Sequence, residues 1–321
     1  MPSQSLQIEF AQNSARTTKI NTLLVVAAVL VHPVTKQVLP MAVEPIVRSD
    51  GDKKNDCERN AIARLIKRVR KQHPKLKLLV IEDGLSSNAP RIADLKAEKM
   101  HFLLGAKPGD HEHLFDQVHD AMDRDEVRVE RARVASGKAT HDTQTQYIED
   151  LELNKSNSDV RVNFLQHHHF DGETAKTLKC FSWVTDLDLS GKSLGQYQRA
   201  GRCRWRVENE TFNTLKNQGY QLEHNYGHGK TNLMTVLALL MFLAFAVDQI
   251  QEACCGLYAA AVARSGRRIR LGGVSAKTSS SLQVLQFRGL VFRDCNGGAF
   301  QTASWIIADC CDQSFSQQPI T

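Results

Sequence analysis

The sequence predicts an α/β protein: a mixed sheet flanked by helices, with a mainly β insertion before the last helical part of the chain. Three observations lead to this prediction. Two apolar, strand-like runs at 20–31 and 36–47 are followed by a segment with helical spacing. A short β-branched run, a helix and a second strand come next, in the order of a parallel pair with its crossover. From 127 to 189 apolar and polar residues alternate, as they do in β-strands.

The first elements are a hairpin and a helix. Residues 20–31 read INTLLVVAAVLV, a continuous apolar run that indicates a deeply buried strand. Residues 36–47 read KQVLPMAVEPIV, in which Pro40 and Pro45 favour an irregular or edge strand. Asp and Asn residues then favour the start of a helix, whose apolar side chains recur at helical spacing until Pro74 ends it.

A strand, a helix and another strand follow Pro74. The run LLVI ends at Ile81 and is followed by Glu82, Asp83 and a glycine, and Asn88 opens the next helix. Asp83 therefore lies at the carboxyl end of a predicted parallel strand, where ligand sites of open α/β sheets collect. A carboxylate beside a glycine-containing loop is a candidate metal ligand. The competing interpretation is that Asp83 only caps the turn.

The chain turns helical from about Ser193 to Ala263, and one stretch there is rich in charge. RCRWRVENETFNTLKNQGY, residues 202–220, places Arg204 and Glu208 one helical turn apart, within about 40° on a helix that advances about 100° per residue. A surface ion pair between them is the ordinary explanation. The alternative is that Glu208 is a catalytic acid facing a phosphate backbone.

Two further groups lie in strand-like segments before that helix. Most tryptophans in the setting of Trp183 belong to the core, and a minority stack on bases, where each stack contributes about 1–3 kcal/mol. The three histidines His167–His169 are consecutive, and consecutive residues of a strand point to alternate faces. They are therefore not expected to bind one metal ion, and we expect a surface or turn feature.

Composition and charge are those of an ordinary soluble protein. Lys and Arg total 41 against 35 Asp and Glu, a formal net charge of +6 that is compatible with a polyanionic partner and equally with a solvated surface. The 8 cysteines form no C-x-x-C motif, so reduced thiols in a cytoplasmic protein are expected. The longest apolar run, Leu233–Val247, is shorter than the roughly 20 residues that span a bilayer. It predicts a buried core helix and no membrane partner.

Two long segments read VIEDGLSSNAPRIADLKAEKMHFLLGAKPGDH and RWRVENETFNTLKNQGYQLEHNYGHGK. They resemble bacterial insertion-sequence transposases of the DDE (Asp-Asp-Glu) class, in the branch whose terminal helix carries a Tyr-Arg-Glu-Lys signature. The resemblance extends from about Leu23 to Cys255. It implies a ribonuclease H-like sheet in which Asp83 is the second catalytic acid and Glu208 the third. The implied activity is that of a DNA transposase, a polynucleotidyl transferase that cleaves and joins DNA at transposon ends.

The same resemblance implies metal ligands, partners and a location. Asp83 and Glu208 would hold Mg²⁺ or Mn²⁺, and two such ions about 3.5–4 Å apart activate a water or 3′-hydroxyl and stabilise the leaving oxygen. Arg204 and Lys216 would contact phosphate, and Trp183 would stack on a flipped base. The partners would be transposon ends and target DNA, bound by a homodimer in the bacterial cytoplasm, associated with the nucleoid when on DNA.

The terminal signature is incomplete in this chain. Its tyrosine should lie three residues before Arg204, where the chain has Gly201, and Tyr197, one helical turn further back, is the nearest substitute. Lys216 comes one residue later than the signature places its lysine, and Leu215 holds the formal position.

The first catalytic Asp of the family is not found. The family carries it on a strand before the hairpin, usually in an Asp-Gly pair, whereas no Asp precedes Leu23 and Glu9 is the only acid there. These differences imply an amino-terminally truncated or frame-disrupted transposase, which would be inactive because one metal-binding carboxylate is missing.

The chain is thereby divided into four regions, and three alternatives remain. The regions are 1–126, the first part of the ribonuclease H-like core; 127–190, the β-rich insertion; 191–263, the helical part that completes the core and carries the Glu; and 264–321, a carboxyl-terminal segment with weak periodicity. One alternative is a non-catalytic DNA-binding remnant, and another is a metal-dependent nuclease without transposon specificity. The third, a purely structural α/β protein, would require Asp83 and Glu208 to lie far apart.

Overall fold

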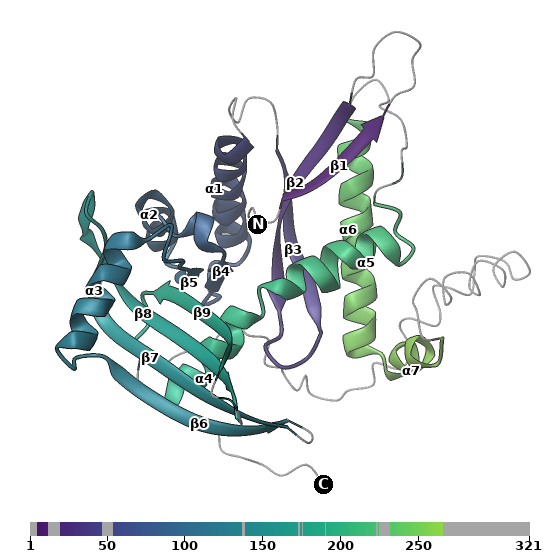
Figure 1. Cartoon of the computed structure of the whole chain (residues 1–321). Helices are drawn as coiled ribbons and strands as arrows, with labels where there is room; N and C mark the ends of the chain where they lie inside the picture. The colour runs from purple at the N-terminus through teal and green to yellow at the C-terminus, as the bar shows by residue number, and fades with distance from the viewer. Residues whose placement is uncertain are drawn as a thin grey trace, which may run out of the picture.

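The computed structural model has two β-sheets with helices packed around them (Figure 1). The structure describes residues 5–11, 20–46, 54–136, 139–172, 174, 176–189, 191–222, 224 and 232–265. The helices are α1 (Lys54–Gln72), α2 (Ala89–Ala97), α3 (Glu112–Asp123), α4 (Gly191–Arg202), α5 (Asn213–Asn217), α6 (Leu233–Cys254) and α7 (Gly256–Ser265). The predicted region 264–321 lies almost entirely outside the described residues.

The smaller sheet contains the predicted hairpin. Its antiparallel strands, in spatial order, are β1 (Ser5–Ala11), β2 (Ile20–Val31) and β3 (Val38–Pro45). β1 pairs with Ile20–Val26 and β3 with Val25–Val31, so each edge of β2 is paired over only part of its length. The ring Nδ1 of His32 accepts hydrogen bonds from the backbone N–H groups of Val34 and Thr35, which closes the β2–β3 turn.

The larger sheet has six strands in the order β4–β5–β9–β8–β7–β6. They are β4 (Leu79–Glu82), β5 (His101–Gly105), β6 (Arg128–Ser136), β7 (Ala139–Asn154), β8 (Asn157–Asp171) and β9 (Thr177–Thr185). β4 and β5 are parallel and α2 connects them, which confirms the predicted strand–helix–strand unit. All other neighbours are antiparallel, so the chain has a mixed sheet flanked by helices, as the sequence predicts.

The strands of the predicted region 127–190 extend the core sheet instead of forming a sheet of their own. β9 pairs with β5, with Val184 opposite Leu104, and the Thr185 hydroxyl donates a 2.6 Å hydrogen bond to the Phe102 carbonyl at this junction. The one sheet that the sequence predicts is divided elsewhere, because β2 and β4 do not pair in the described part of the chain. Alternation reveals strands but does not identify their neighbours.

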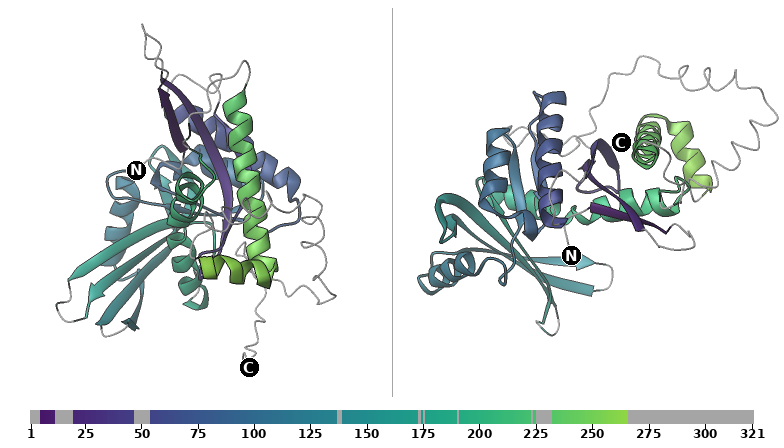
Figure 2. Two further views of the ribbon diagram at one scale, coloured as in Figure 1. Left: turned by 90° about the vertical axis from the view of Figure 1, so that its right-hand side faces the viewer. Right: turned by 90° about the horizontal axis from the view of Figure 1, so that it is seen from above.

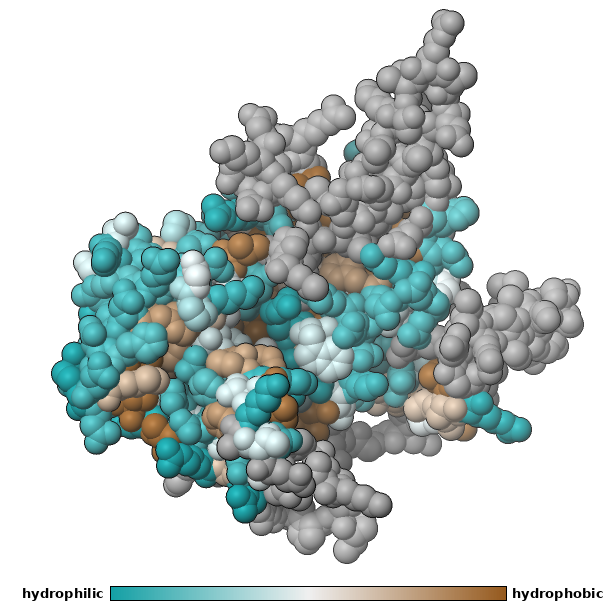
Figure 3. Space-filling view, in the orientation of Figure 1, coloured by the Kyte–Doolittle hydropathy of each residue, from teal (hydrophilic) through white to brown (hydrophobic). Residues whose placement is uncertain are grey.

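Helices cover both sheets and bury the main core between them. From α1, Ala61, Leu65 and Val69 are buried in the same cluster as Phe102 and Leu104 of β5. On the same face of the six-stranded sheet, Phe115 of α3 meets Phe164 of β8 edge-to-face, with ring centroids 5.3 Å apart. The outward face over α3 and this sheet is largely hydrophilic (Figure 3). Deep burial of β5 therefore fixes the position of the β4 end that carries Asp83.

Helix α6 differs from the prediction for its apolar run. The run Leu233–Val247 was expected to be a short, buried core helix, but the helix continues to Cys254, 22 residues in all. Its buried residues are Ala238, Phe242, Phe245 and Gln249, which pack toward β3 and Phe212. By length and composition alone, α6 is the one helix among the described residues that could cross a membrane; a core helix of a soluble protein meets the same test. The fold around it is an ordinary α/β arrangement.

Candidate functional site

Asp83 lies directly after β4, where the chain turns away from the sheet. Its backbone is extended, and its Oδ1 accepts a 3.2 Å hydrogen bond from the Leu85 N–H at the start of a 3₁₀ turn, Gly84–Ser86. Asp83 therefore caps the turn, as one of the two interpretations predicts. The second oxygen, Oδ2, is buried and has no hydrogen-bond partner in the described part of the chain. One carboxylate oxygen caps the turn, and the other remains available for a ligand.

The backbone at this strand end is unusually close to its neighbour. A Cβ atom added to Gly105 would lie 3.0 Å from the Gly84 nitrogen and 3.3 Å from the Asp83 carbonyl carbon. Such distances are shorter than most Cβ contacts, so glycine favours the close approach of the ends of β4 and β5. This approach holds Asp83 at the edge of the sheet.

The Asp83 carboxyl is harder to ionise than an ordinary aspartate. Burial raises its pKa, and the neighbouring Glu82 adds to the rise; the positive charge of Arg204 and the Leu85 N–H lower it, but burial dominates. Glu82 itself is held by Arg91, whose Nε lies 3.0 Å from Glu82 Oε2. A titratable group with a raised pKa at a strand end is a candidate site residue, although structural carboxyls are also shifted in this way.

Arg204 links Asp83 to Glu208. Its Nη1 lies 3.3 Å from Glu208 Oε1, and the two side chains are 29% and 41% exposed. The same arginine lines the cavity that Asp83 lines, and its charge acts on the Asp83 carboxyl. The predicted ion pair is therefore present. Arg204 therefore forms an ion pair with Glu208 and lies near enough to Asp83 for its charge to lower the pKa of that carboxyl.

The segment that carries Glu208 is not the regular α-helix assumed from its spacing. After α4, the Arg206 and Val207 N–H groups bond to carbonyls three residues back. A π-helical turn, Val207–Phe212, follows, in which the Asn213 N–H bonds to the Glu208 carbonyl. The angle of about 40° between Arg204 and Glu208 assumed a regular α-helix, which this segment is not, but the two side chains do meet as that spacing predicts. Single π turns of this kind are frequent at functional sites.

Arg206 gives a physical reason for this irregularity. Its guanidinium donates hydrogen bonds to four backbone carbonyls of the β2–β3 turn, those of residues His32, Pro33, Val34 and Thr35. These hydrogen bonds attach the segment to the smaller sheet. The helical spacing of the sequence does not predict such a long-range contact. Its only signal in the sequence is a third arginine in RCRWRVE.

Trp183 belongs to the core. It is 5% exposed and stacks on Phe181 with ring centroids 5.9 Å apart. A Cβ atom at Gly201 would lie 2.5 Å from Trp183 Cε2, so the indole fills the place of any side chain at 201. This explains why glycine stands where the signature has tyrosine, and Tyr197 is buried in the same cluster. An indole enclosed in this way has no open face for a base, so the core interpretation of Trp183 is the one the structure supports.

Lys216 and the histidines His167–His169 do not line the Asp83 cavity. Lys216 is on α5 next to Leu215, which is fully buried, and Glu208 is likewise not among the residues that line this cavity. His167 is on β8 and only 5% exposed, and its Nδ1 lies 2.9 Å from the Thr145 hydroxyl. The expectation of a surface or turn feature is therefore wrong for His167. Burial lowers its pKa to about 4.

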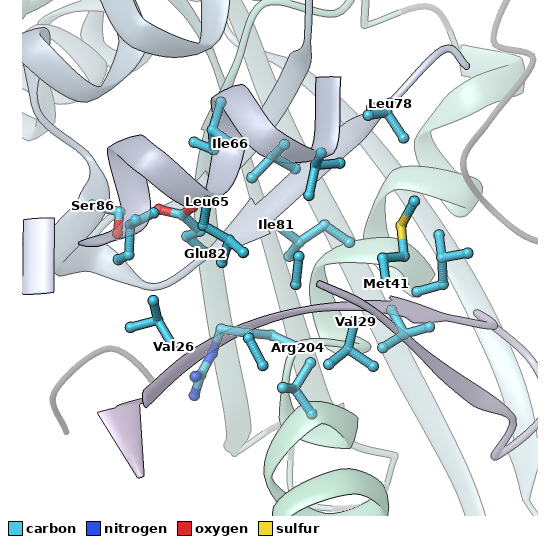
Figure 4. Close-up of a pocket in the computed structure, with 18 of the residues that line it drawn as sticks. Val26, Val29, Met41, Leu65, Ile66, Leu78, Ile81, Glu82, Ser86 and Arg204 are labelled. Carbon is cyan, nitrogen blue, oxygen red and sulfur yellow. The ribbon is translucent and has the colours of Figure 1, made fainter. Parts of the chain in front are cut away.

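The cavity beside Asp83 lies between the two sheets and has a volume of about 190 Å³ (Figure 4). Consecutive residues of β2, Val26–Val31, and of the β4 region, Leu78–Asp83, line it together with apolar residues of α1. Successive strand residues point to opposite faces, so strand edges border the cavity. The edges at Ala27–Val31 and Leu79–Glu82 pair with no strand among the described residues.

The donor set for a metal ion is incomplete. Within the described ranges there is no group of three His, Cys, Asp or Glu side chains that could hold an ion. Asp83 Oδ2 has no partner there, and Glu208 is engaged by Arg204. The described residues therefore do not fit the three-carboxylate, two-ion arrangement.

No protein-family model matches the chain, and none of the curated proteins is significantly similar to it.

Proposed function

We propose that the chain is the core of a DDE-type DNA transposase, with Asp83 and Glu208 as its second and third acids. One observation carries the proposal: carboxylates remote in sequence, one of them buried with a raised pKa, act on the same arginine beside a cavity. The position of Asp83 at the carboxyl end of a parallel strand supports it further.

The residues have distinct roles in this proposal. Asp83 and Glu208 would hold a Mg²⁺ or Mn²⁺ ion, which would supply Lewis-acid activation of a water or 3′-hydroxyl. Arg204 neutralises Glu208 in the absence of metal, and with DNA present its planar guanidinium contacts phosphate. Release of Glu208 from Arg204 would therefore accompany metal binding. The proposed setting is a homodimer on two DNA ends in the bacterial cytoplasm.

The gap between β2 and β4 supports a core that lacks one strand. The two unpaired edges face one apolar cavity, and a strand placed there would join β3, β2, β4 and β5 into a single sheet. Asp83 lies at one end of this gap, where a further acid on that strand would complete the donor set. A ribonuclease H-like core in which no described strand fills this gap, and which is unable to cleave DNA alone, is consistent with these open edges.

A second candidate is a DNA-binding remnant without catalysis. The incomplete donor set and the Arg204–Glu208 ion pair favour it over an active enzyme. A third, a nuclease of the same fold, predicts cleavage of DNA that has no terminal inverted repeats.

Manganese binding and DNA cleavage on the purified chain test these candidates together. We expect weak Mn²⁺ binding, detected by electron paramagnetic resonance, that is lost in Asp83→Asn and in Glu208→Gln and retained in the matched control Glu210→Gln. We also expect DNA binding that weakens as salt rises, without nicking. Metal binding unaffected by both substitutions would contradict the site, an absence of DNA binding would contradict the function, and nicking of arbitrary DNA would identify the nuclease.

A further inference from the structure

A histidine and a cysteine face one another across two neighbouring strands of the larger sheet. His168 of β8 is the direct register partner of Cys180 of β9, and the His168 Nε2 lies 4.0 Å from the Cys180 Sγ. Directly opposite residues of antiparallel strands have Cβ atoms about 4.5–5.5 Å apart, so the backbone itself brings these two side chains together. Cys180 is a free thiol and is exposed, so a ligand from solvent can reach the pair.

The distance between the two atoms suits a metal ion placed between them. Zn²⁺ binds Cys sulfur at about 2.3 Å and His nitrogen at about 2.0–2.1 Å, so a tetrahedral ion holds the two atoms about 3.6 Å apart and a linear arrangement about 4.3 Å apart. The 4.0 Å between Sγ and Nε2 lies between these limits. The competing explanation is a direct hydrogen bond, which is weak here because a thiol is a weak donor.

Neighbouring side chains hold both groups in place. Phe170 lies two residues further along β8, on the same face, and stacks on the His168 ring with centroids 5.8 Å apart and planes 13° from parallel. Gln166, two residues before His168, forms a hydrogen bond with Cys180. Ligands that are already oriented lose less conformational entropy when an ion binds, so these contacts favour a metal site.

The protonation of the two groups is compatible with metal binding. Burial lowers the pKa of the His168 imidazole, so near pH 7 it is neutral and can act as a ligand. Burial raises the pKa of the Cys180 thiol, although the hydrogen bond with Gln166 lowers it. An ion must therefore displace the thiol proton: the sulfur–metal bond forms as the S–H bond breaks, and the proton passes to solvent.

Charge favours this face of β8 over the face that carries His167 and His169. Those two histidines point to the opposite side of the strand, where Arg202 of α4 lies over Phe181, the register partner of His167. The charge of Arg202 contributes to the lowered pKa of His167, whereas burial is the cause of the shift at His168. A guanidinium repels a cation, so the His167 face is the poorer metal site.

We propose that the His168 Nε2 and the Cys180 Sγ bind a thiolate-preferring metal cation, Zn²⁺ or Cu⁺. Thiolate and imidazole suit both of these cations, whereas Mg²⁺ and Mn²⁺ prefer oxygen ligands. Within the described residues no third His, Cys, Asp or Glu side chain completes the group, so water would fill the remaining positions around Zn²⁺. The site uses neither Asp83 nor Glu208, and the inference does not depend on the proposed function.

Metal titration of the full, reduced chain tests the proposal. Co²⁺, which replaces Zn²⁺ in spectroscopy, should produce the near-ultraviolet absorption of a thiolate–cobalt bond, and added Zn²⁺ should abolish it. Cu⁺ is titrated separately without oxygen against a competing chelator, which distinguishes the two cations. Cys180→Ser and His168→Gln should each weaken binding of the tighter cation at least about 10-fold, the loss that follows removal of even an outer-shell partner.

Cys254→Ser and His119→Gln are the matched controls, and neither should change the affinity. Cys254 is an exposed free thiol at the end of α6, and Figure 2 shows α6 and the six-stranded sheet on different sides of the molecule. His119 is an exposed histidine of α3. Circular dichroism establishes that each variant is folded. Nitrogen NMR of the unsubstituted chain adds a test that needs no variant, since the metal should shift the His168 Nε2 signal.

Three results would overturn the proposal. The chain could bind neither cation, binding could be unchanged in both Cys180→Ser and His168→Gln, or binding could depend on Cys180 while His168→Gln and the His168 Nε2 signal show no effect. The last result would indicate attachment to a single thiolate instead of a bridge between the two strands. A loss in both variants and in neither control, with a shifted Nε2 signal, is the result that the proposal predicts.

Discussion

The structure around Asp83 follows from local sequence signals, whereas the structure around Glu208 depends on contacts with distant residues. Asp83 follows a short parallel strand, and local signals account for its place: a β-branched run, a capping aspartate and a glycine after it. Glu208 lies in a segment whose periodicity is helical but whose structure is a turn, a π-helical turn and a short helix. Local turn chemistry is readable from sequence, whereas the distortion around Glu208 depends on contacts with distant residues.

The largest expected effect is a loss of protein stability at low pH, caused by His167 in the six-stranded sheet. His167 has a folded pKa of about 4, below its ordinary value of 6.5, so its contribution to stability is complete above pH 6.5 and is lost as pH falls toward 4. The loss should reach about 3 kcal/mol near pH 4, from 1.36 kcal/mol per pKa unit. Urea unfolding at pH 7 and pH 4 measures it. His167→Gln, which can still bond to Thr145, should lose correspondingly less stability between the two pH values.

The next effect tests the packing that fixes the segment before Glu208. Gly201→Ala should destabilise the protein by roughly 2 kcal/mol, because its Cβ would overlap the Trp183 indole. Gly195→Ala in the same helix is the matched control, since its Cβ would meet nothing closer than 3.7 Å and should be neutral or stabilising. Equal unfolding free energies for the two variants would contradict the packing at Gly201.

Removal of the tertiary anchor should have a smaller effect. Arg206→Met removes the donors to four carbonyls of the β2–β3 turn and should cost about 1 kcal/mol, since those carbonyls can regain hydrogen bonds to water. Hydrogen exchange should also become faster at the N–H groups of the Val207–Phe212 turn. Arg202→Met removes the same charge from an exposed position and is the control. Unchanged exchange in Arg206→Met would show that the π turn has another cause.

The smallest effect distinguishes Asp83 from a purely structural cap. Folding raises its pKa, so its ionisation opposes folding: the cost is absent below the ordinary aspartate pKa and present above the raised one. Asp83→Asn can keep the cap to Leu85 and should be slightly more stable than the parent at pH 7, with no gain at pH 3. A variant that is less stable at pH 7 would indicate that capping is the only role of the carboxylate.

Much of the fold could be predicted because its signals are local. The hairpin, the helix that ends near Pro74 and the parallel strand pair each follow from apolar runs and turn residues. The separation of β2 and β4 into two sheets could not be predicted, because the sequence of a strand does not indicate which strand pairs with its edge. The exposure of one side of α6 could not be predicted either, because an apolar run predicts burial unless the face that packs is known.

The candidate site could be predicted only in part, because only some of its contacts follow from local sequence signals. The i,i+4 spacing gave the Arg204–Glu208 pair, and strand-end position gave Asp83. The contact between Trp183 and Gly201 could not be predicted, because nothing in the sequence indicates that the indole fills the space beside Gly201.

The central claim is that Arg204 connects Asp83 to Glu208, and the pKa of Asp83 tests it most directly. Carbon-detected NMR titration of the Asp83 carboxyl should give a higher pKa in Arg204→Met, which loses the stabilising charge, and a lower one in Glu208→Gln, which frees that charge. Glu210→Gln should leave the value unchanged. An Asp83 pKa that is the same in all four proteins would contradict the connection between the two acids.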